Sequence, residues 1–392
     1  MTKEYTFYFD ETYHTRKITE KNKIFDLKDN VEFYVGCYIG SCKWDEIKSD
    51  IIKLENDYKE KQHIPTESEL KTKTLIKANQ LPFGVCSLKD NTVDFYTRLL
   101  QILNGKVKIH LSILNKQEYL IKTVLPNYSW FDNYGVNYKE FIYSFTKFVI
   151  THPHYRIIDI LVSKEKDRQK RRKIIRILQK HLDKISGIDK KRDEIKAVHK
   201  MINIFYNLPM HFNNNFPLPW DYSISSVMFF NFTKELKLPI EKIYIDEEKN
   251  TVEATKKYFS NVEAIKSNEN IQIRVCDWVV GLISRLILSY SQNYRTIPLE
   301  IDLSETIHIL SNDFFNFTPE TDKLMRLLYK VFILQQEGYW STAGSIYNDG
   351  VTEFYTFLRY KDFCEENNIP PTSDEFNIYL GEEQQYVFSQ FI

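Results

Sequence analysis

The sequence predicts a mixed α/β protein in which a mixed β-sheet is flanked by helices and carries a large helical insertion and a helical C-terminal extension. Three observations lead to this fold class. Short apolar segments with strand-like alternation open the chain and return after residue 240. Between and after them, apolar residues recur at helical spacing. At 392 residues, the chain is long enough for two or three compact units.

The composition is that of a globular protein. Hydrophobic residues make up 43% and aromatic residues 15% of the chain, which excludes a disordered protein. The five cysteines are scattered and lack the Cys-x-x-Cys spacing of a zinc site, which favours reduced thiols in a cytoplasm. The first residues do not resemble a signal peptide, and no apolar run approaches the length of a membrane span. We therefore expect a cytoplasmic protein without a membrane partner.

The segment from Tyr5 to His14 is the predicted first strand. Tyr5, Phe7 and Phe9 would share one face, and the residues between them the other, so both faces are mostly apolar. A strand covered on both faces is usually central in its sheet. Asp10 at its end would lie over the core, where a hard divalent cation can replace the missing counter-charge. The alternative is an edge strand that runs into a turn.

The remainder of residues 1–115 alternates between strands and helices. A second strongly apolar strand is expected at 32–39, and short β-compatible pieces at 16–27 would complete an antiparallel meander with the first strand. Thr66, with Glu69 three residues later, resembles the start of a helix. The other expected elements are a helix at 44–61, a turn at 82–84, a helix at 92–103 and a strand at 107–113.

From about residue 117 to 237 the pattern is that of helices and polar loops, with a clear amphipathic helix at 167–185. Residues 161–200 contain 15 Lys or Arg against 6 Asp or Glu, whereas residues 301–392 contain 5 against 15. The neutral total of 53 basic and 53 acidic residues therefore hides a basic middle and an acidic tail. The basic segment can track a nucleic-acid backbone, either DNA or RNA. The alternatives are a solvated helix face or a surface that docks on the acidic tail.

The late part of the chain repeats the pairing of apolar segments with acids. A strand at 241–246 ends in Asp246, and a helix at 270–290 carries Asp277 within a long apolar stripe. A carboxylate among apolar residues is costly to bury unless it is paired or bound to a metal. The remaining expectations are helices at 251–259 and 324–336 and a loop at 365–374.

Four short motifs together resemble the DUF3800 family. They are Tyr8-Phe9-Asp10-Glu11, Glu69-Leu70-Lys71, Ile245-Asp246, and the run from Ile271-Gln272 to Cys276-Asp277-Trp278-Val279-Val280-Gly281. The resemblance implies a ribonuclease H-like core formed by residues 1–115 and 240–290. It leaves a mainly helical basic insertion at 116–239 and a helical acidic region at 291–392.

The chain departs from the family pattern in places. Thr12 and Tyr13 stand where the family commonly has Ser and Gly, and Arg274 to Asp277 replaces a run of the Gln-Leu-Ala-Asp type. Ribonuclease H-like enzymes also often place an acid on the fourth strand. The fourth predicted strand, at 107–113, offers His110 and Ser112 in place of an acid.

The resemblance implies a nuclease that hydrolyses phosphodiester bonds with Mg²⁺ or Mn²⁺, with defence against foreign genetic elements as its role. Asp10 would bridge two metal ions, and Glu69 and Asp277 would complete the ligand set. Asp246 would be a fourth ligand and Glu11 a ligand or its neighbour, while Lys71 would neutralise a phosphate oxygen or orient Glu69. Two metals can stabilise both the attacking and the leaving oxygen.

Two alternatives remain open. One is a catalytically inactive scaffold of the same fold that binds nucleic acid or protein. The other is a metal-independent ribonuclease with a catalytic His, because Arg176 precedes His181 and Arg192 precedes His199 in the basic helical region. The oligomeric state is open.

Overall fold

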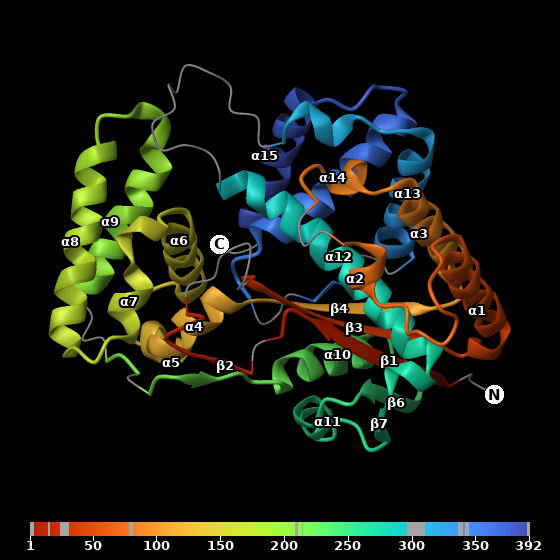
Figure 1. The fold of residues 1–392 in the computed structure, drawn as a ribbon. Helices are drawn as coiled ribbons and strands as arrows, with labels where there is room; N and C mark the ends of the chain where they lie inside the picture. The colour runs from red at the N-terminus through yellow and green to blue at the C-terminus, as the bar shows by residue number, and fades with distance from the viewer. Residues whose placement is uncertain are drawn as a thin grey trace.

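The computed structural model describes residues 4–14, 16–23, 31–77, 81–207, 211–213, 215–295, 310–335, 340–341 and 345–389. It shows a mixed α/β protein in which a twisted sheet lies between layers of helices, with a helical insertion beside it (Figure 1). The main sheet has the strand order β7-β6-β1-β3-β4-β8. Its strands are β1 (Tyr5–Thr12), β3 (Phe33–Ser41), β4 (Lys108–Asn115), β6 (Ile240–Asp246), β7 (Val262–Ile265) and β8 (Trp340–Ser341).

Strand β1 lies inside the sheet, between β3 and β6. These two neighbours run in opposite directions. β1 pairs antiparallel with β3 and parallel with β6. β3 pairs antiparallel with β4, and β6 pairs parallel with β7. The carboxyl ends of β1, β6 and β7 therefore meet at one edge of the sheet.

Side chains of β1 alternate between two separate cores. Phe7 and Phe9 pack on one side with Phe229 of helix α10 (Ser223–Glu235), and helix α11 (Lys249–Thr255) lies on this side too. Tyr8 points to the other side, where the larger core contains α1 (Trp44–Lys61), α3 (Asp90–Leu103) and α12 (Ile271–Arg295). The expected two-sided burial of this strand is confirmed.

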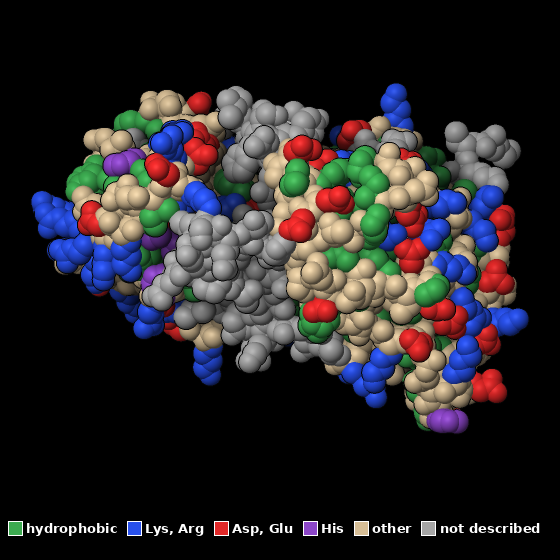
Figure 2. Space-filling view, turned by 90° about the horizontal axis from the view of Figure 1, so that it is seen from above, with side chains coloured by type: hydrophobic (Ala, Val, Ile, Leu, Met, Phe, Trp, Pro, Cys, Tyr) green, Lys and Arg blue, Asp and Glu red, His purple; other side chains and the backbone are tan. Residues whose placement is uncertain are grey.

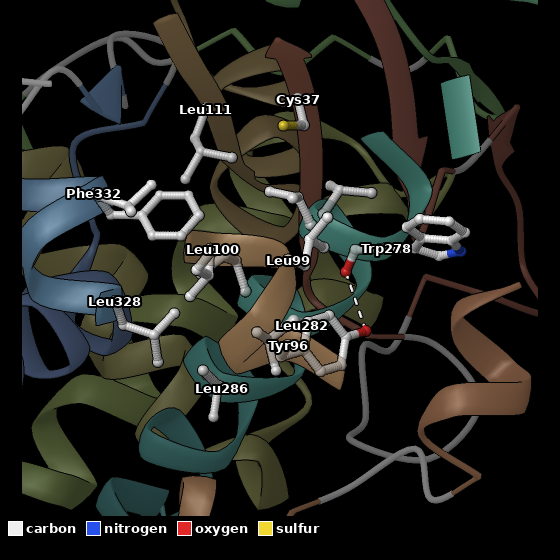
Figure 3. Close-up of a cluster of buried hydrophobic side chains, with 14 of the residues drawn as sticks. Cys37, Tyr96, Leu99, Leu100, Leu111, Trp278, Leu282, Leu286, Leu328 and Phe332 are labelled. Atoms are coloured by element: carbon white, nitrogen blue, oxygen red, sulfur yellow. Dashed lines mark hydrogen bonds between the residues drawn. The ribbon is translucent and has the colours of Figure 1, made fainter. Parts of the chain in front are cut away.

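Helix α12 is the main support of that larger core. Its Leu282 and Leu286 face Leu99 of α3, and the cluster continues to Cys37 and Leu111 of the sheet (Figure 3). The Tyr96 hydroxyl of α3 donates a hydrogen bond to the Trp278 carbonyl oxygen at 3.1 Å (Figure 3). A fully buried aromatic residue with its polar groups satisfied fixes the helix position strongly. The first turns of α12 are thereby held against α3.

Gly281 allows a close approach between α12 and the short helix α2 (Thr72–Leu75). A Cβ atom added at Gly281 would lie 2.2 Å from Cγ2 and 2.4 Å from Oγ1 of Thr72. No side-chain carbon fits at such distances. The glycine therefore sets how near the segment before α2 comes to the first turns of α12.

The insertion has a hydrophobic core of its own, formed largely by Phe131, Phe141, Phe145, Ile174 and Phe205 with their neighbours. Figure 1 places it beside the sheet, on the left. Its helices are α4 (Lys116–Val124), α5 (Tyr128–Asp132), α6 (Tyr138–Thr151), α7 (Ile157–Val162), α8 (Asp167–Ile185) and α9 (Arg192–Asn207), with short 3₁₀ turns at Pro153–Tyr155 and Asp189–Lys191. Within the range 116–239, α10 differs because it covers the main sheet.

The C-terminal helices α13 (Pro319–Tyr329), α14 (Asp349–Glu366) and α15 (Ser373–Ser389) join the larger core. Tyr290 of α12 packs against Phe354 and Phe357 of α14, with ring centroids 5.4 and 4.9 Å apart. A π-helical turn at Lys330–Leu334 follows α13. The acidic tail is thus folded on the side of the molecule that carries α12 (Figure 1).

Buried polar bonds join the C-terminal region to the insertion. The carboxylate of Glu118 in α4 accepts the amide N–H of Ile346 at 2.8 Å and that of Tyr347 at 2.6 Å. The Tyr143 hydroxyl of α6 donates to Asp349 at 2.8 Å. Hydrogen bonds to a buried carboxylate are strong because no water competes for it.

Several sequence expectations are corrected. The helix expected to start at Thr66 is wrong, because 66–70 forms turns and extended chain and α2 begins only at Thr72. The pieces expected at 16–27 are not part of the meander: β2 (Lys17–Ile18) pairs with β5 (Leu218–Pro219) in a separate sheet, and 24–27 lie outside the described residues. β4 is instead the third antiparallel strand.

Other boundaries differ by a few residues. α11 ends at Thr255 rather than Phe259, and the expected loop at 365–374 is shortened to 367–372 by α14 and α15. Strand β7 has no counterpart among the expected elements. The helix expected at 324–336 begins at Pro319, and residue 336 lies outside the described part. Among the described residues, no helix combines the length and apolarity that crossing a membrane requires.

Candidate functional site

Asp10 and Asp246 lie side by side where the pairing of β1 with β6 ends, Asp246 as the last residue of β6 and Asp10 two residues before the end of β1. The parallel register pairs Tyr8 with Tyr244 and Phe9 with Ile245, so the next residues along both strands are the two acids. The Tyr8 and Tyr244 rings stack with centroids 5.2 Å apart, which places them on one face. Because strand side chains alternate, the acids two residues further on share that face.

Asp277 reaches the same face from α12, which crosses the sheet there. The neighbouring Cys276 thiol donates to the Tyr8 carbonyl oxygen at 3.2 Å, fixing this turn of the helix on β1. The Asp277 carboxylate accepts the backbone N–H of Thr72 at 2.7 Å, and its carbonyl oxygen accepts the Thr72 hydroxyl at 2.6 Å. The acid is therefore held between the sheet and α2.

Glu69 and Lys71 lie on the extended segment that leads into α2. Their side chains form an ion pair with Nζ and Oε2 3.1 Å apart, and Lys71 is 46% exposed. Burial acts to lower the pKa of Lys71, but the hydrogen bond and charge of Glu69 raise it overall, and Asp277 and Asp246 act in the same direction. The ammonium group therefore lies within the field of all three carboxylates.

The pKa values of the part-buried acids Asp10 and Asp277 show the cost of this arrangement. Burial raises the pKa of Asp10 well above its usual value; the charges of Asp277, Asp246 and Glu11 add to this, and the hydrogen bond from the Glu11 amide opposes it. Burial likewise raises the pKa of Asp277, although Thr72, Lys71 and Arg285 counteract it. The carboxylates of the site outnumber the cations near them, and a divalent cation would supply the missing positive charge.

Glu11 points to the opposite side of the sheet from Asp10. Glu11 pairs with Gly36 of the neighbouring strand β3, and its Oε2 accepts a hydrogen bond from the Tyr34 hydroxyl at 2.6 Å. Burial raises the pKa of Glu11 to about 7, the Tyr34 hydrogen bond opposes this shift, and Glu248 adds to it. The structure brings Asp10, Asp246, Asp277 and the Glu69–Lys71 pair together and leaves Glu11 apart from them.

The spacing of possible metal ligands identifies a different group. Among the described residues, one set of three, His152, His181 and Glu194, has ligand atoms that all lie within 4.8 Å of one another. It lies in the insertion, and sequence reasoning missed it. Its members come from three separate segments with no ligand-spacing motif, so no sequence signal indicated it.

The basic segment 161–200 exposes a row of cations. Arg168, Arg172 and Arg176 are all exposed and lie four residues apart along α8. Figure 2 shows Lys and Arg side chains gathering at the end of the molecule formed by the insertion. Five cations of this segment form ion pairs with acids of the insertion: Lys173, Lys191, Arg192, Lys196 and Lys200. Docking on the acidic tail stays an alternative.

The two Arg and His pairs of the metal-independent alternative lie in different surroundings. His181 is buried, and its Nε2 lies 2.8 Å from Glu194, whereas Arg176 is exposed. His199 and Arg192 are both exposed, and Arg192 pairs with Asp189. The catalytic role of either His stays a prediction.

Comparison of the chain with protein-family models, with curated proteins and with solved structures gives no significant match. The resemblance to the DUF3800 family therefore stays an expectation carried by its four motifs. The function has to be inferred from the geometry of the acids and the cations.

Proposed function

We propose that the protein is a divalent-metal-dependent nuclease that hydrolyses phosphodiester bonds of nucleic acid on a ribonuclease H-like core. The observation that carries the proposal is the convergence of Asp10, Asp246 and Asp277 on one face at the end of the central strand. Three separated segments of the chain deliver these acids to one place. A purely structural role would not require part-buried acids to share a site at a cost in charge repulsion.

The topology supports this reading of the fold. Because β2 leaves the main sheet to pair with β5, the fourth strand of that sheet in chain order is β6 rather than β4. β6 ends in Asp246, so an acid stands on the strand where ribonuclease H-like enzymes often carry one. Asp246 of β6, and not His110 or Ser112 of β4, is therefore the residue to compare with the acid on the fourth strand of ribonuclease H-like enzymes.

The donor set fits Mg²⁺ or Mn²⁺. Carboxylate oxygens are the ligands that these hard ions prefer. Asp10, Asp246 and Asp277 would hold the metal ions, and Glu69 would be a further ligand. Bound metal ions would stabilise the attacking and leaving oxygens of the phosphodiester. Thr72 keeps Asp277 oriented through its two hydrogen bonds.

Lys71 would supply the contact to the substrate phosphate. Its side chain is about half exposed and already lies in the field of Asp246, Asp277 and Glu69. An ammonium at the rim of a carboxylate site can bind a phosphate oxygen and reduce the repulsion that the acids exert on a polyanion. Without substrate, the ion pair with Glu69 holds the Lys71 ammonium group in position.

The exposed row Arg168, Arg172 and Arg176 would bind the nucleic-acid backbone away from the acids. Phosphate contacts of this kind add affinity without sequence preference. Whether the substrate is DNA or RNA is left to the assay. A role in defence against foreign genetic elements rests on the family resemblance.

The test is Mn²⁺ titration calorimetry and cleavage of labelled single-stranded and double-stranded DNA and RNA by the full chain. We expect Asp10→Asn and Asp277→Asn to lose both metal binding and cleavage. Glu241→Gln is the matched control, because Glu241 is an exposed acid at the opposite end of β6. Cleavage retained by Asp10→Asn, or cleavage in EDTA, would remove this mechanism.

A nucleic-acid-binding scaffold without catalysis is the second candidate. It is favoured by the finding that the group with ligand atoms within 4.8 Å lies in the insertion and not at these acids. In that case the full chain would bind nucleic acid through its basic row, and titration with Mn²⁺ would show no heat that depends on Asp10.

A further inference from the structure

His152, His181 and Glu194 form a second cluster in the core of the insertion. His152 follows the last residue of α6, His181 lies in the fourth turn of α8, and Glu194 lies in the first turn of α9. His181 Nε2 is 2.8 Å and His152 Nε2 is 3.9 Å from Glu194 Oε1. Three helical segments thus direct one potential ligand each to a common point.

The other ring nitrogen of each histidine is already engaged. His152 Nδ1 lies 3.1 Å from the Phe148 carbonyl oxygen and 2.9 Å from the Thr151 hydroxyl oxygen. The carbonyl can only accept, and the Thr151 hydroxyl donates to the Lys147 carbonyl oxygen at 2.8 Å, so the proton of a neutral ring belongs on Nδ1.

His181 Nδ1 lies 3.2 Å from the Tyr155 hydroxyl, which can accept in the same way. In the metal-free protein the 2.8 Å contact between His181 Nε2 and Glu194 Oε1 is a hydrogen bond with the ring nitrogen as donor. A bound cation would take the place of that proton, and the contacts on Nδ1 would orient both rings toward it. Such outer contacts are how proteins orient histidine ligands of a metal.

The surroundings make the cluster a partly closed site. The side chains of His152 and His181 are 7% and 4% exposed, and that of Glu194 is 26% exposed. Lys191 Nζ lies 2.6 Å from Glu194 Oε2, which leaves Oε1 to face the histidines. One side therefore stays open to solvent, as in zinc sites that keep a position for water.

We propose that His152, His181 and Glu194 bind a Zn²⁺-class transition-metal ion that ties α6, α8 and α9 together. Two imidazole nitrogens and one carboxylate oxygen suit Zn²⁺ rather than Mg²⁺. In a tetrahedral site with bonds of about 2.0–2.2 Å, ligand atoms are roughly 3.3–3.5 Å apart. The observed separations of 2.8 and 3.9 Å bracket that value, so small side-chain shifts would admit the ion.

This site is independent of the proposed nuclease centre. Its donors are mainly nitrogen, it lies in the insertion, and none of its residues touches the acids at the end of β1. The competing explanation is a metal-free hydrogen-bonded cluster in which the Nε2–H of His181 donates to Glu194. That cluster would have no use for a vacant lone pair on His152.

The test uses the full chain, stripped of metal by a chelator and dialysed. Zn²⁺ binding is measured by competition with a chromophoric chelator, and Co²⁺ is used as a probe of the ligand set through its visible absorption. We expect one high-affinity ion per chain. His181→Asn and Glu194→Gln should each weaken Zn²⁺ binding by more than the roughly 10- to 100-fold seen for changes beside metal ligands.

Two controls keep the result interpretable. His154→Ala changes an exposed histidine near the cluster and should bind Zn²⁺ as the wild type does. Asp10→Asn should also keep Zn²⁺ binding while losing Mn²⁺ binding, which separates this site from the nuclease centre. Circular dichroism must show each variant folded, and Glu194→Gln is chosen because it conserves volume. Absence of Zn²⁺ binding by the wild type, or Zn²⁺ affinity as high as that of the wild type in Glu194→Gln and His181→Asn, would overturn the proposal.

Discussion

Thr72 holds Asp277 at two points, through its backbone N–H to the carboxylate at 2.7 Å and through its hydroxyl to the carbonyl oxygen at 2.6 Å. The chain segment that carries Glu69 and Lys71 is thereby attached to the helix that carries Asp277. The geometry of the candidate metal centre depends on this attachment more than on any direct contact between the acids.

Thr72→Val should remove the hydroxyl bond and keep the amide bond. We expect a loss of about 1–2 kcal/mol in the free energy of unfolding and a weaker affinity for Mn²⁺. Thr92→Val is the matched control, because the buried Thr92 hydroxyl donates to the Leu75 carbonyl oxygen at 2.9 Å. The control should lose similar stability in denaturant titration and retain its Mn²⁺ affinity. Equal Mn²⁺ affinities for both variants would contradict the positioning role of Thr72.

Gly281→Ala should destabilise the protein by about 1–3 kcal/mol, because the new methyl group would overlap the Thr72 side chain. It should also displace the segment with Lys71 and reduce cleavage. Gly381 of α15 provides the comparison, since nothing lies within 4 Å of a Cβ atom added there. Gly381→Ala should leave stability unchanged or increase it by up to about 1 kcal/mol. Thermal unfolding of both variants checks the difference.

Asp10→Asn should stabilise the metal-free protein by an amount of order 1 kcal/mol, because it removes a part-buried charge that is repelled by Asp277 and Asp246. The same change should eliminate the increase in unfolding temperature that Mn²⁺ gives the wild type. Function and stability are therefore expected to oppose each other at this residue. A less stable metal-free variant would show that the acids do not repel one another as inferred.

The buried carboxyl group of Glu353 makes the free energy of unfolding depend on pH. It is fully buried in α14, and burial raises its pKa well above its usual value of 4.5; Asp349 adds to this shift and Lys147 opposes it. The folded state holds this proton more tightly than the unfolded state, so its contribution is complete below about pH 4.5 and declines as pH rises toward the folded pKa. Glu353→Gln should flatten the decline above pH 4.5, whereas Glu366→Gln, an exposed change in the same helix, should not.

Charge reversal at Arg168, Arg172 and Arg176 should weaken nucleic-acid binding and lower the slope of log affinity against log salt concentration by about 2 to 3. Reversing three exposed lysines elsewhere, Lys48, Lys53 and Lys89, is the control for net charge. Fluorescence anisotropy over a series of salt concentrations gives the slope. An equal effect of both triple variants would show that the row on α8 is a solvated face only.

Strong periodicity explains why much of the fold could be predicted. The helices at 44–61 and 167–185 have the boundaries expected from their apolar spacing, since one buried face determines where each begins and ends. The helix start at Thr66 failed for a tertiary reason. The Leu70 carbonyl oxygen accepts the Trp278 indole N–H at 2.7 Å, which holds the chain extended there. Capping residues cannot reveal a contact more than two hundred residues away.

Some residues of the candidate sites could likewise be predicted from the sequence, and others could not. Asp10 and Asp246 could be predicted because each ends an apolar strand, and Asp277 because it interrupts an apolar helix stripe. Strand β7 was missed because it is short and two of its four residues are exposed. His152 and His181 could not be paired from sequence, since only the packing of the insertion brings their rings to within 4.3 Å between centroids.

The hydrogen bonds that the Ile346 and Tyr347 amides donate to Glu118 attach the C-terminal region to the insertion. The helices of the C-terminal region also pack in the larger core. α14 begins at Asp349, which Tyr143 of the insertion binds, and continues along α12, the helix of Asp277. A tilt of the insertion must therefore break buried hydrogen bonds or pull α14 with it. If the arginine row binds a long polyanion as proposed, the load on it would be transmitted through these contacts toward Asp277.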